Sequence, residues 1–144
     1  MRAHLESAAA HGRAAAALRL ASVEVLHTGH RRALASPALA HGTTRDLLER
    51  SIRAELAART GLSERDVARR LEQGELLVEH LPLTRTLLAE ARIVWEAAEA
   101  ICATASKLPA ASRGVLDERA AEAVLTMTFE QLSRALRRWQ KELR

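Results

Sequence analysis

The chain has 144 residues, a net charge of +4 and a composition that is 48% hydrophobic but only 2% aromatic. This length fits one ordinary domain, and an Ala- and Leu-rich chain with few β-branched residues favours helices over sheets. Arg or Glu interrupts every apolar run, which argues against a membrane-spanning helix of about 20 apolar residues and against a signal peptide, so we expect a cytoplasmic protein.

The first predicted element is a long amphipathic helix over residues 3–35. Small and apolar residues recur along it at spacings of three and four, which is the repeat of one helix face. These residues are Leu5, Ala9, Ala16, Leu20, Val23, His27, His30 and Leu34. A loop is then expected at Ser36-Pro37 and His41-Gly42, where residues that disfavour helices gather.

Two further helices are predicted between residues 44 and 81. Thr43, with Asp46 three residues later, is a predicted N-cap for a helix over 44–59. Its expected buried residues are Leu47, Leu48, Ile52 and Leu56. The next helix is predicted to start from the N-cap Ser63 and to end before Pro82. Its apolar stripe is Val67, Leu71, Gly74, Val78 and Leu81, and Gly74 in the middle would let a neighbouring helix approach.

The C-terminal half is also predicted to be helical. The pattern over 82–105 fits either one helix or two, and another helix is expected over 110–126. The last helix spans 128–143, with Thr128 and Gln131 as a capping box. Its stripe consists of Phe129, Leu132, Leu136, Trp139 and Leu143. We therefore predict an all-α, single-domain bundle of six or seven helices over residues 1–144.

One motif points to a function. Residues 56–71 read LAARTGLSERDVARRL, which matches a helix-turn-helix within the segment 44–81. Ala57 supplies a small residue where the helices cross, Gly61 can adopt positive φ in the turn, and Leu62 and Val67 would fix the angle between the helices. The start of the second helix would then face the DNA major groove. The predicted contacts there are Ser63, Arg65, Arg69 and Arg70.

Two observations leave that interpretation open. Glu64 and Asp66 put negative charge beside the predicted DNA contacts, although acids are also favoured at the N-terminus of any helix. A second candidate for phosphate contact is the polar face of the last helix. Its residues are Arg134, Arg138 and Lys141. Cations at a helix C-terminus are stabilised by the helix dipole without any ligand, so this face also fits a solvated surface.

Other kinds of site find little support in the sequence. His27 and His30 are three residues apart, but no carboxylate or thiolate lies at a matching spacing, so we expect burial rather than a metal site. The single cysteine, Cys102, is expected to be a buried structural thiol. There is no nucleophile elbow or Gly-rich phosphate loop. We therefore expect no catalytic residue, no cofactor and no metal.

Two segments resemble a known family. Residues 53–93, RAELAARTGLSERDVARRLEQGELLVEHLPLTRTLLAEARI, and 107–139, KLPAASRGVLDERAAEAVLTMTFEQLSRALRRW, are similar to the 13E12-repeat proteins of actinobacteria and their phages, also called the domain of unknown function 222. The resemblance implies a helical domain that precedes a metal-dependent HNH nuclease. The His-His-Asn cluster of that nuclease does not occur here, so nuclease activity is not carried over to this chain.

The sequence departs from this family at one place. Where relatives typically show Gly-Arg-Ile-Ser before the middle helix, this chain has Ala91-Arg92-Ile93-Val94. The change removes a helix breaker and a cap, and therefore favours a continuous helix through residue 92.

These observations give two hypotheses. The first is a DNA-binding helical module that contacts duplex DNA, either as the targeting part of an HNH-nuclease-associated protein or as a stand-alone relative. The alternative is a protein interaction or dimerisation module without DNA contact. In that case the long N-terminal helix and the last helix would form the interface of a homodimer.

Overall fold

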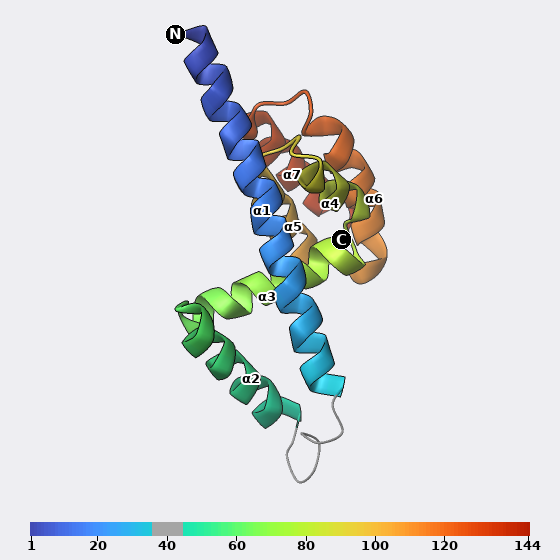
Figure 1. Cartoon of the computed structure of the whole chain (residues 1–144). Helices are drawn as coiled ribbons and strands as arrows, with labels where there is room; N and C mark the ends of the chain where they lie inside the picture. Colours follow the sequence, from blue (N-terminus) through green and yellow to red (C-terminus); the bar gives the residue numbers. More distant parts are fainter. Residues whose placement is uncertain (36–44) are drawn as a thin grey trace.

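The computed structural model describes residues 1–35 and 45–144. The predicted loop at Ser36-Pro37 and His41-Gly42 and the predicted N-cap at Thr43 lie outside these residues. Within the described ranges the chain forms seven α-helices and no strand, which confirms the prediction of an all-α bundle (Figure 1). The helices are α1 (Arg2–Ala35), α2 (Arg45–Thr60), α3 (Glu64–Glu79), α4 (Pro82–Ala89), α5 (Trp95–Ser106), α6 (Ala110–Ala123) and α7 (Phe129–Glu142).

Helix α1 contacts α2, α3, α4 and α5, and it runs along the whole bundle (Figure 1). Its middle section buries the expected face, which consists of Ala16, Leu20, Val23 and His27. The first part of the predicted stripe is not buried, because the N-terminal end of α1 projects beyond the other helices (Figure 1). Leu5 is therefore 63% exposed. None of the described helices is both long and apolar enough to cross a membrane.

Helix α3 crosses beneath α1 at Gly74. A Cβ atom built on Gly74 would lie 2.7 Å from the carbonyl oxygen of Val23 and 3.0 Å from the Cβ of His27. Only a residue without a side chain allows this close contact between the two backbones. The prediction that Gly74 admits a neighbouring helix is confirmed.

The main core is formed by one face of α1, the second half of α3, and helices α4 to α7. Its largest fully buried apolar side chains are Leu20, Leu77, Leu81, Leu88, Ile101, Leu116 and Leu132. Helix α7 begins with the predicted capping box of Thr128 and Gln131. Leu132 and Leu136 of its stripe are buried in this core, whereas Phe129 is 53% exposed. The apolar side of α7 is thus used largely for packing within the chain.

A buried acid holds the start of α4. The N-cap residue Leu81 makes no side-chain capping bond, and the cap comes instead from Asp117 of α6. Asp117 accepts hydrogen bonds from the backbone N–H of Leu83 (2.8 Å) and of Thr84 (3.0 Å) and from the Thr84 hydroxyl (2.6 Å). A carboxylate at this position also interacts favourably with the positive end of the helix dipole. Asp117 therefore joins α6 to α4 by polar contacts inside the core.

The expectation of a continuous helix through residue 92 is wrong. Helix α4 ends at Ala89 and α5 begins at Trp95, so the segment 82–105 holds two helices. Ala91 has a φ of 56°, in the left-handed region. The N–H of Ala91 donates to Leu88 O and the N–H of Arg92 donates to Leu87 O, both at 3.0 Å, which is the Schellman arrangement at a helix C-terminus. The break persists without a glycine because these bonds hold the left-handed residue in place.

This strain leads to a stability prediction. Ala91→Gly is expected to stabilise the protein by about 0.5–1 kcal/mol. Alanine in the left-handed region costs about 1–2 kcal/mol, and glycine removes this strain. Part of the gain is offset because glycine makes the unfolded chain more flexible and therefore raises the entropy cost of folding. Urea unfolding followed by circular dichroism would measure the change. Ala103→Gly, at an exposed position inside α5, should instead destabilise by about 1 kcal/mol. If Ala91→Gly and Ala103→Gly lowered the free energy of unfolding equally, the proposed strain at Ala91 would be contradicted.

Candidate nucleic-acid interface

The predicted turn lies between α2 and α3. Helix α2 ends at Thr60, and Gly61 follows with a φ of +75° and an N–H that donates to Ala57 O at 3.0 Å. Ser63 is the N-cap of α3, and its hydroxyl oxygen accepts from the N–H of Asp66 at 3.1 Å. Val67 is fully buried behind the turn. The predicted break at Gly61 and the predicted cap at Ser63 are confirmed.

Residues 45–70, here called the arm, extend from the bundle (Figure 1). This extension explains why the predicted burial of α2 is only partly right. Ile52 is buried, Leu48 and Leu56 are half-buried, and Leu47 is 53% exposed. Only one side of the arm contacts the bundle, so α2 buries a single residue, Ile52, among those the structure describes.

The outer edge of the arm carries the predicted DNA contacts. Ser63, Arg65 and Arg69 are exposed, and Arg70 is half-buried. Neither Arg65 nor Arg69 forms an ion pair with any acid that the structure describes. Glu64 is exposed beside them. The edge therefore offers two unpaired guanidinium groups and one competing carboxylate at the start of α3.

Arg70 has a charged neighbour on α1 that the sequence pattern did not indicate. Burial and the charge of Arg19 on α1 lower the pKa of Arg70, while Asp66 acts in the opposite direction. The Arg19 guanidinium lies over the Trp95 ring, 5.2 Å from its centroid. The Nε atoms of Arg19 and Arg70 are both buried, and neither has a hydrogen-bond partner among the described residues.

Two neighbouring arginines with unsatisfied donors form an arrangement that suits an anion. Buried donors without acceptors cost free energy, and the repulsion between like charges adds to that cost. A phosphate outside the fold would reduce this repulsion, but it could not reach the two buried Nε atoms. No sequence signal links Arg19 to Arg70, because they come together only through the crossing of α1 and α3.

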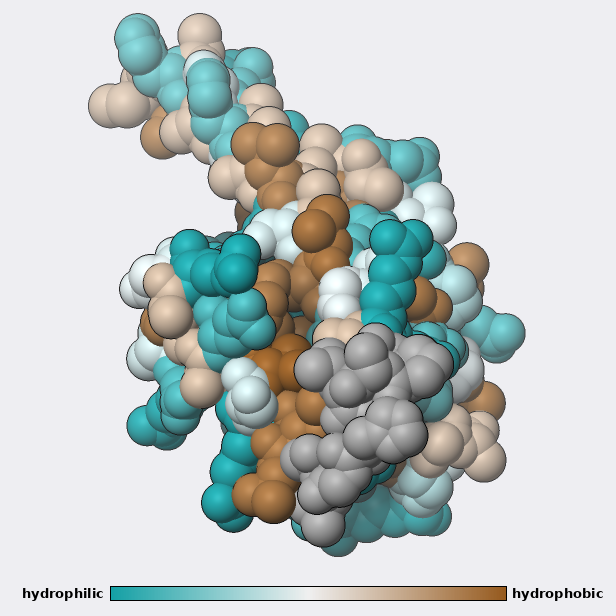
Figure 2. Space-filling view, turned by 60° about the horizontal axis from the view of Figure 1, so that its bottom comes forward, coloured by the Kyte–Doolittle hydropathy of each residue, from teal (hydrophilic) through white to brown (hydrophobic). Residues whose placement is uncertain are grey.

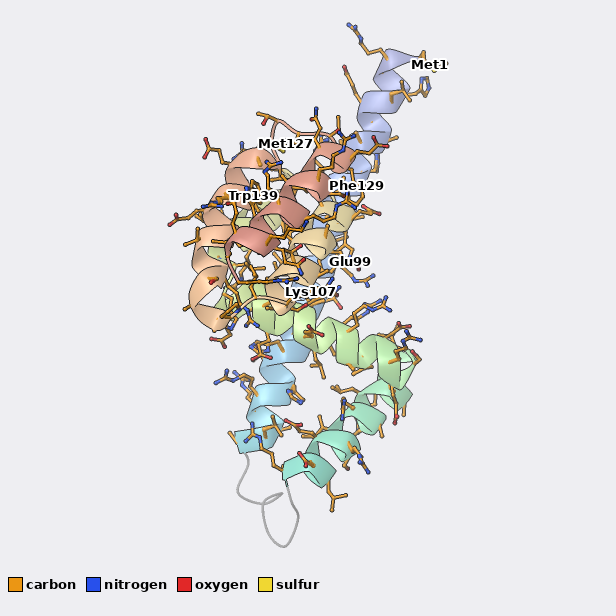
Figure 3. The ribbon with its side chains drawn as sticks, turned by 180° about the vertical axis from the view of Figure 1, so that it is seen from behind. Met1, Glu99, Lys107, Met127, Phe129 and Trp139 are labelled. Carbon is orange, nitrogen blue, oxygen red and sulfur yellow. The ribbon has the colours of Figure 1, made fainter. Side chains whose placement is uncertain are left out.

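The second predicted group of cations lies elsewhere on the molecule. Arg134, Arg138 and Lys141 are exposed on α7, and Arg134 lies 3.9 Å from Glu130 in an i,i+4 ion pair. Helix α7 packs on α5 and α6. Its C-terminal end is tied to α6 by the Arg119–Glu142 ion pair and by the Ser112 hydroxyl, which donates to Leu143 O. Figure 3 shows α7, with Phe129 and Trp139 labelled, in the bundle and apart from the arm. The structure does not combine the two basic groups into one patch.

A cavity of about 570 Å³ separates the arm from the end of α1. Its lining is mixed in charge and comes from α1, α2 and α3. The lining includes His27, His30, Arg31, Arg45, Glu49, Arg53, Glu72 and Glu75. Figure 2 looks at this end of the molecule and shows apolar surface in the hollow between the helices. Because both acids and bases line it, the cavity has no clear preference for an anion or a cation.

The two histidines predicted to be buried line this cavity, and His27 is buried whereas His30 is only half-buried. Nε2 of His27 lies 3.4 Å from Oε1 of Glu79, which also accepts a hydrogen bond from Arg31 at 3.0 Å. Burial lowers the pKa of His30, with a smaller opposing effect from Glu49. Among residues 1–35 and 45–144 there is no group of three or more side chains that could hold a metal ion. His27 therefore forms part of the contact that fixes α1 on α3.

A groove of about 300 Å³ lies between α3 and α5, and Arg69 and Cys102 line it. Cys102 is buried, as predicted, and burial raises its pKa to about 12. The thiol is therefore neutral at physiological pH and is a poor nucleophile. Glu99 accepts hydrogen bonds from Gln73 Nε2 (3.2 Å) and Trp95 Nε1 (3.3 Å), and the bond from Gln73 connects α3 to α5.

Comparisons with protein-family models, curated proteins and solved structures found no match for this chain.

Proposed function

We propose that this chain is a cytoplasmic DNA-binding module that contacts the phosphates of duplex DNA through the outer edge of the arm. The observation that carries the proposal is the exposure of Arg65 and Arg69 on the outer edge of the arm, where neither forms an ion pair with a described acid. The neighbouring guanidinium groups of Arg19 and Arg70 add positive charge, although their Nε atoms are buried within the fold. A DNA backbone would supply acceptors and negative charge to the exposed guanidinium groups of Arg65 and Arg69.

The direction of α3 supports the same surface. Its N-terminus carries a partial positive charge and points outward from the turn after Gly61 (Figure 1). Glu64 and Asp66 reduce the net attraction, but Asp66 is half-buried and its N–H serves the Ser63 cap. We expect modest affinity that depends on salt, which is typical of phosphate contacts.

The resemblance to the 13E12-repeat proteins suggests where such a module would act. We propose that the chain is the targeting part of an HNH-nuclease-associated protein or a stand-alone relative. The geometry at Ala91 supports the resemblance, because its φ of 56° is a conformation that favours glycine. Those relatives show a glycine at this position.

The proposal predicts a salt-dependent affinity for duplex DNA. Fluorescence anisotropy with a labelled duplex, measured at several salt concentrations, gives the affinity and its slope against the logarithm of salt. The variant Arg65→Gln with Arg69→Gln should bind at least about tenfold more weakly at low salt, and the slope should fall by about 2, because two phosphate contacts are lost. Both residues are exposed, so the fold should be unaffected.

A matched control separates local contacts from net charge. Arg2→Gln with Arg92→Gln removes the same charge from exposed positions outside the arm and should leave the slope unchanged. Equal weakening in both double variants would mean that only the overall charge matters. Loss of binding in an Arg134→Gln, Lys141→Gln variant alone would move the contact to α7. The absence of any salt-dependent binding at low ionic strength would refute the proposal.

A further inference from the structure

The groove between α3 and α5 combines an apolar wall with several hydrogen-bond acceptors. Its volume of about 300 Å³ lies at the low end for sites that bind small molecules. The buried side chains of Leu76 and Cys102 supply apolar surface. Glu72, Gln73 and Glu99 supply oxygen acceptors. A groove of this kind suits a small ligand that has an apolar body and a polar group rich in donors.

Gln73 holds an acceptor that has no donor. This residue lines the groove and is only 5% exposed. Its Nε2 donates to Glu99 at 3.2 Å, but its Oε1 is buried and has no hydrogen-bond partner among the described residues. A buried carbonyl oxygen without a donor costs free energy. The Gln73 amide would therefore gain from a donor that enters the groove.

The two carboxylates of the groove have no cationic partner. Glu99 is half-buried and Glu72 is exposed, and neither forms an ion pair with a base that the structure describes. Glu99 lies on α5 beside α3 (Figure 3), and its Oε2 accepts only from the neutral groups of Gln73 and Trp95. A half-buried carboxylate loses hydration, and a cation in contact with it would offset that loss.

The thiol of Cys102 indicates the sign of the potential inside the groove. Burial is the main cause of its raised pKa, and the carboxylates of Glu99, Glu72 and Asp117 raise this pKa further. Nearby negative charge has this effect because it disfavours the thiolate. Arg69 also lines the groove, but it is exposed to water. The inner part of the groove is therefore electronegative and attracts cations.

We propose that this groove binds a small organic cation, namely a primary ammonium group carried on a short alkyl chain. The ammonium group would donate to Glu99 in place of Gln73 Nε2. The released Gln73 amide can then turn its Oε1 toward the same group, because the last torsion of a glutamine side chain is soft. Glu72 would accept the remaining N–H, so the three donors of a primary ammonium group are all used.

A titration with n-hexylammonium, followed by nuclear magnetic resonance of the isotope-labelled chain without DNA, tests the site. The indole N–H of Trp95 and the side-chain NH2 of Gln73 both bond to Glu99. Their signals should shift together and saturate, with a dissociation constant in the millimolar range that is typical of so small a ligand. The corresponding groups of Trp139 and Gln140 on α7 are internal controls and should not shift.

Two further ligands separate the charge from the alkyl chain. Hexanol has the same chain without charge and should bind at least about tenfold more weakly, because it forms no charge-assisted bond with the carboxylates. Hexanoate has the opposite charge and should give no saturating shift of the Gln73 signal. Equal affinity for hexylammonium and hexanol overturns the proposal, as does a saturating shift with hexanoate.

Three variants test the position of the ligand. Ala103 is exposed and lines the groove, so Ala103→Leu should fill the groove and weaken hexylammonium at least about tenfold without loss of the fold. Glu72→Gln should weaken it at least about threefold, because one carboxylate is lost. Glu75→Gln is the matched control, since Glu75 is exposed on the same helix but does not line the groove.

The outcomes of these variants are decisive. Equal weakening by Glu72→Gln and Glu75→Gln would reduce the effect to net charge and overturn the proposal. Unchanged affinity in Ala103→Leu overturns it as well, because the alkyl chain would then lie elsewhere. The proposed DNA contact rests on Arg65 and Arg69 and is measured with duplex DNA, so these results leave it unaffected.

Discussion

Asp117→Ala is expected to destabilise the protein by about 3 kcal/mol, which would lower the urea midpoint strongly. The substitution removes the acceptor for three donors near the start of α4, namely two backbone N–H groups and the Thr84 hydroxyl. Thr84 is fully buried, so water cannot reach its hydroxyl group without opening the core. Each buried donor without an acceptor costs about 1–3 kcal/mol.

Three further variants define this effect. Glu118→Ala removes the neighbouring acid at an exposed position and should change stability by less than about 0.5 kcal/mol. Asp117→Asn keeps one oxygen that can accept a hydrogen bond, but it replaces the other with an NH2 group, which is itself a donor. We therefore expect a loss of stability between those of Glu118→Ala and Asp117→Ala. Thr84→Val should cost less than Asp117→Ala, because one of the three bonds is lost. Equal stability of the Asp117→Ala and Glu118→Ala proteins would contradict this role of Asp117.

Gly74→Ala is expected to destabilise by about 2 kcal/mol or more, although alanine is the better helix former by about 1 kcal/mol. The new Cβ would lie 2.7 Å from the backbone oxygen of Val23, and backbone cannot yield as a flexible side chain can. The helices α1 and α3 must therefore move apart, which loosens the core on both sides of the crossing.

The opposite sign is expected at a second helical glycine. Gly114 is exposed in α6, and a Cβ there would meet no described atom within 4 Å. Gly114→Ala should therefore stabilise by about 0.5–1 kcal/mol. Chemical denaturation of both variants gives the comparison. If Gly74→Ala proved as stable as Gly114→Ala, the tight contact between α1 and α3 would be disproved.

Local signals in the sequence predict most of the helix ends. The caps at Ser63 and Thr128 lie where short-range hydrogen bonding places them, and Gly61 marks the turn between α2 and α3. The break at Ala91 was missed, because alanine usually continues a helix and the left-handed conformation is held by bonds to Leu87 and Leu88. The exposure of Leu5 was missed because periodicity identifies a face but not the length of the helices that cover it.

The candidate site was predicted only in part. The exposed positions of Arg65 and Arg69 follow from the helix-turn-helix pattern, because both lie on the side of α3 opposite Val67 and Leu71. The proximity of Arg19 and Arg70 depends on contacts between helices that are far apart in sequence. The same is true of Asp117 and Thr84. Periodicity within one helix contains no information on which helices become neighbours.

The position of α1 has a consequence for synthesis on the ribosome. This helix leaves the exit tunnel before the other described helices, and the residues that cover Leu20 and Val23 belong to helices made later, among them α3, α4 and α5. Contacts between distant segments form only after long loops close. The nascent chain must therefore carry the apolar side of α1 uncovered until much of its sequence has been translated, and in that interval the helix is open to chaperones.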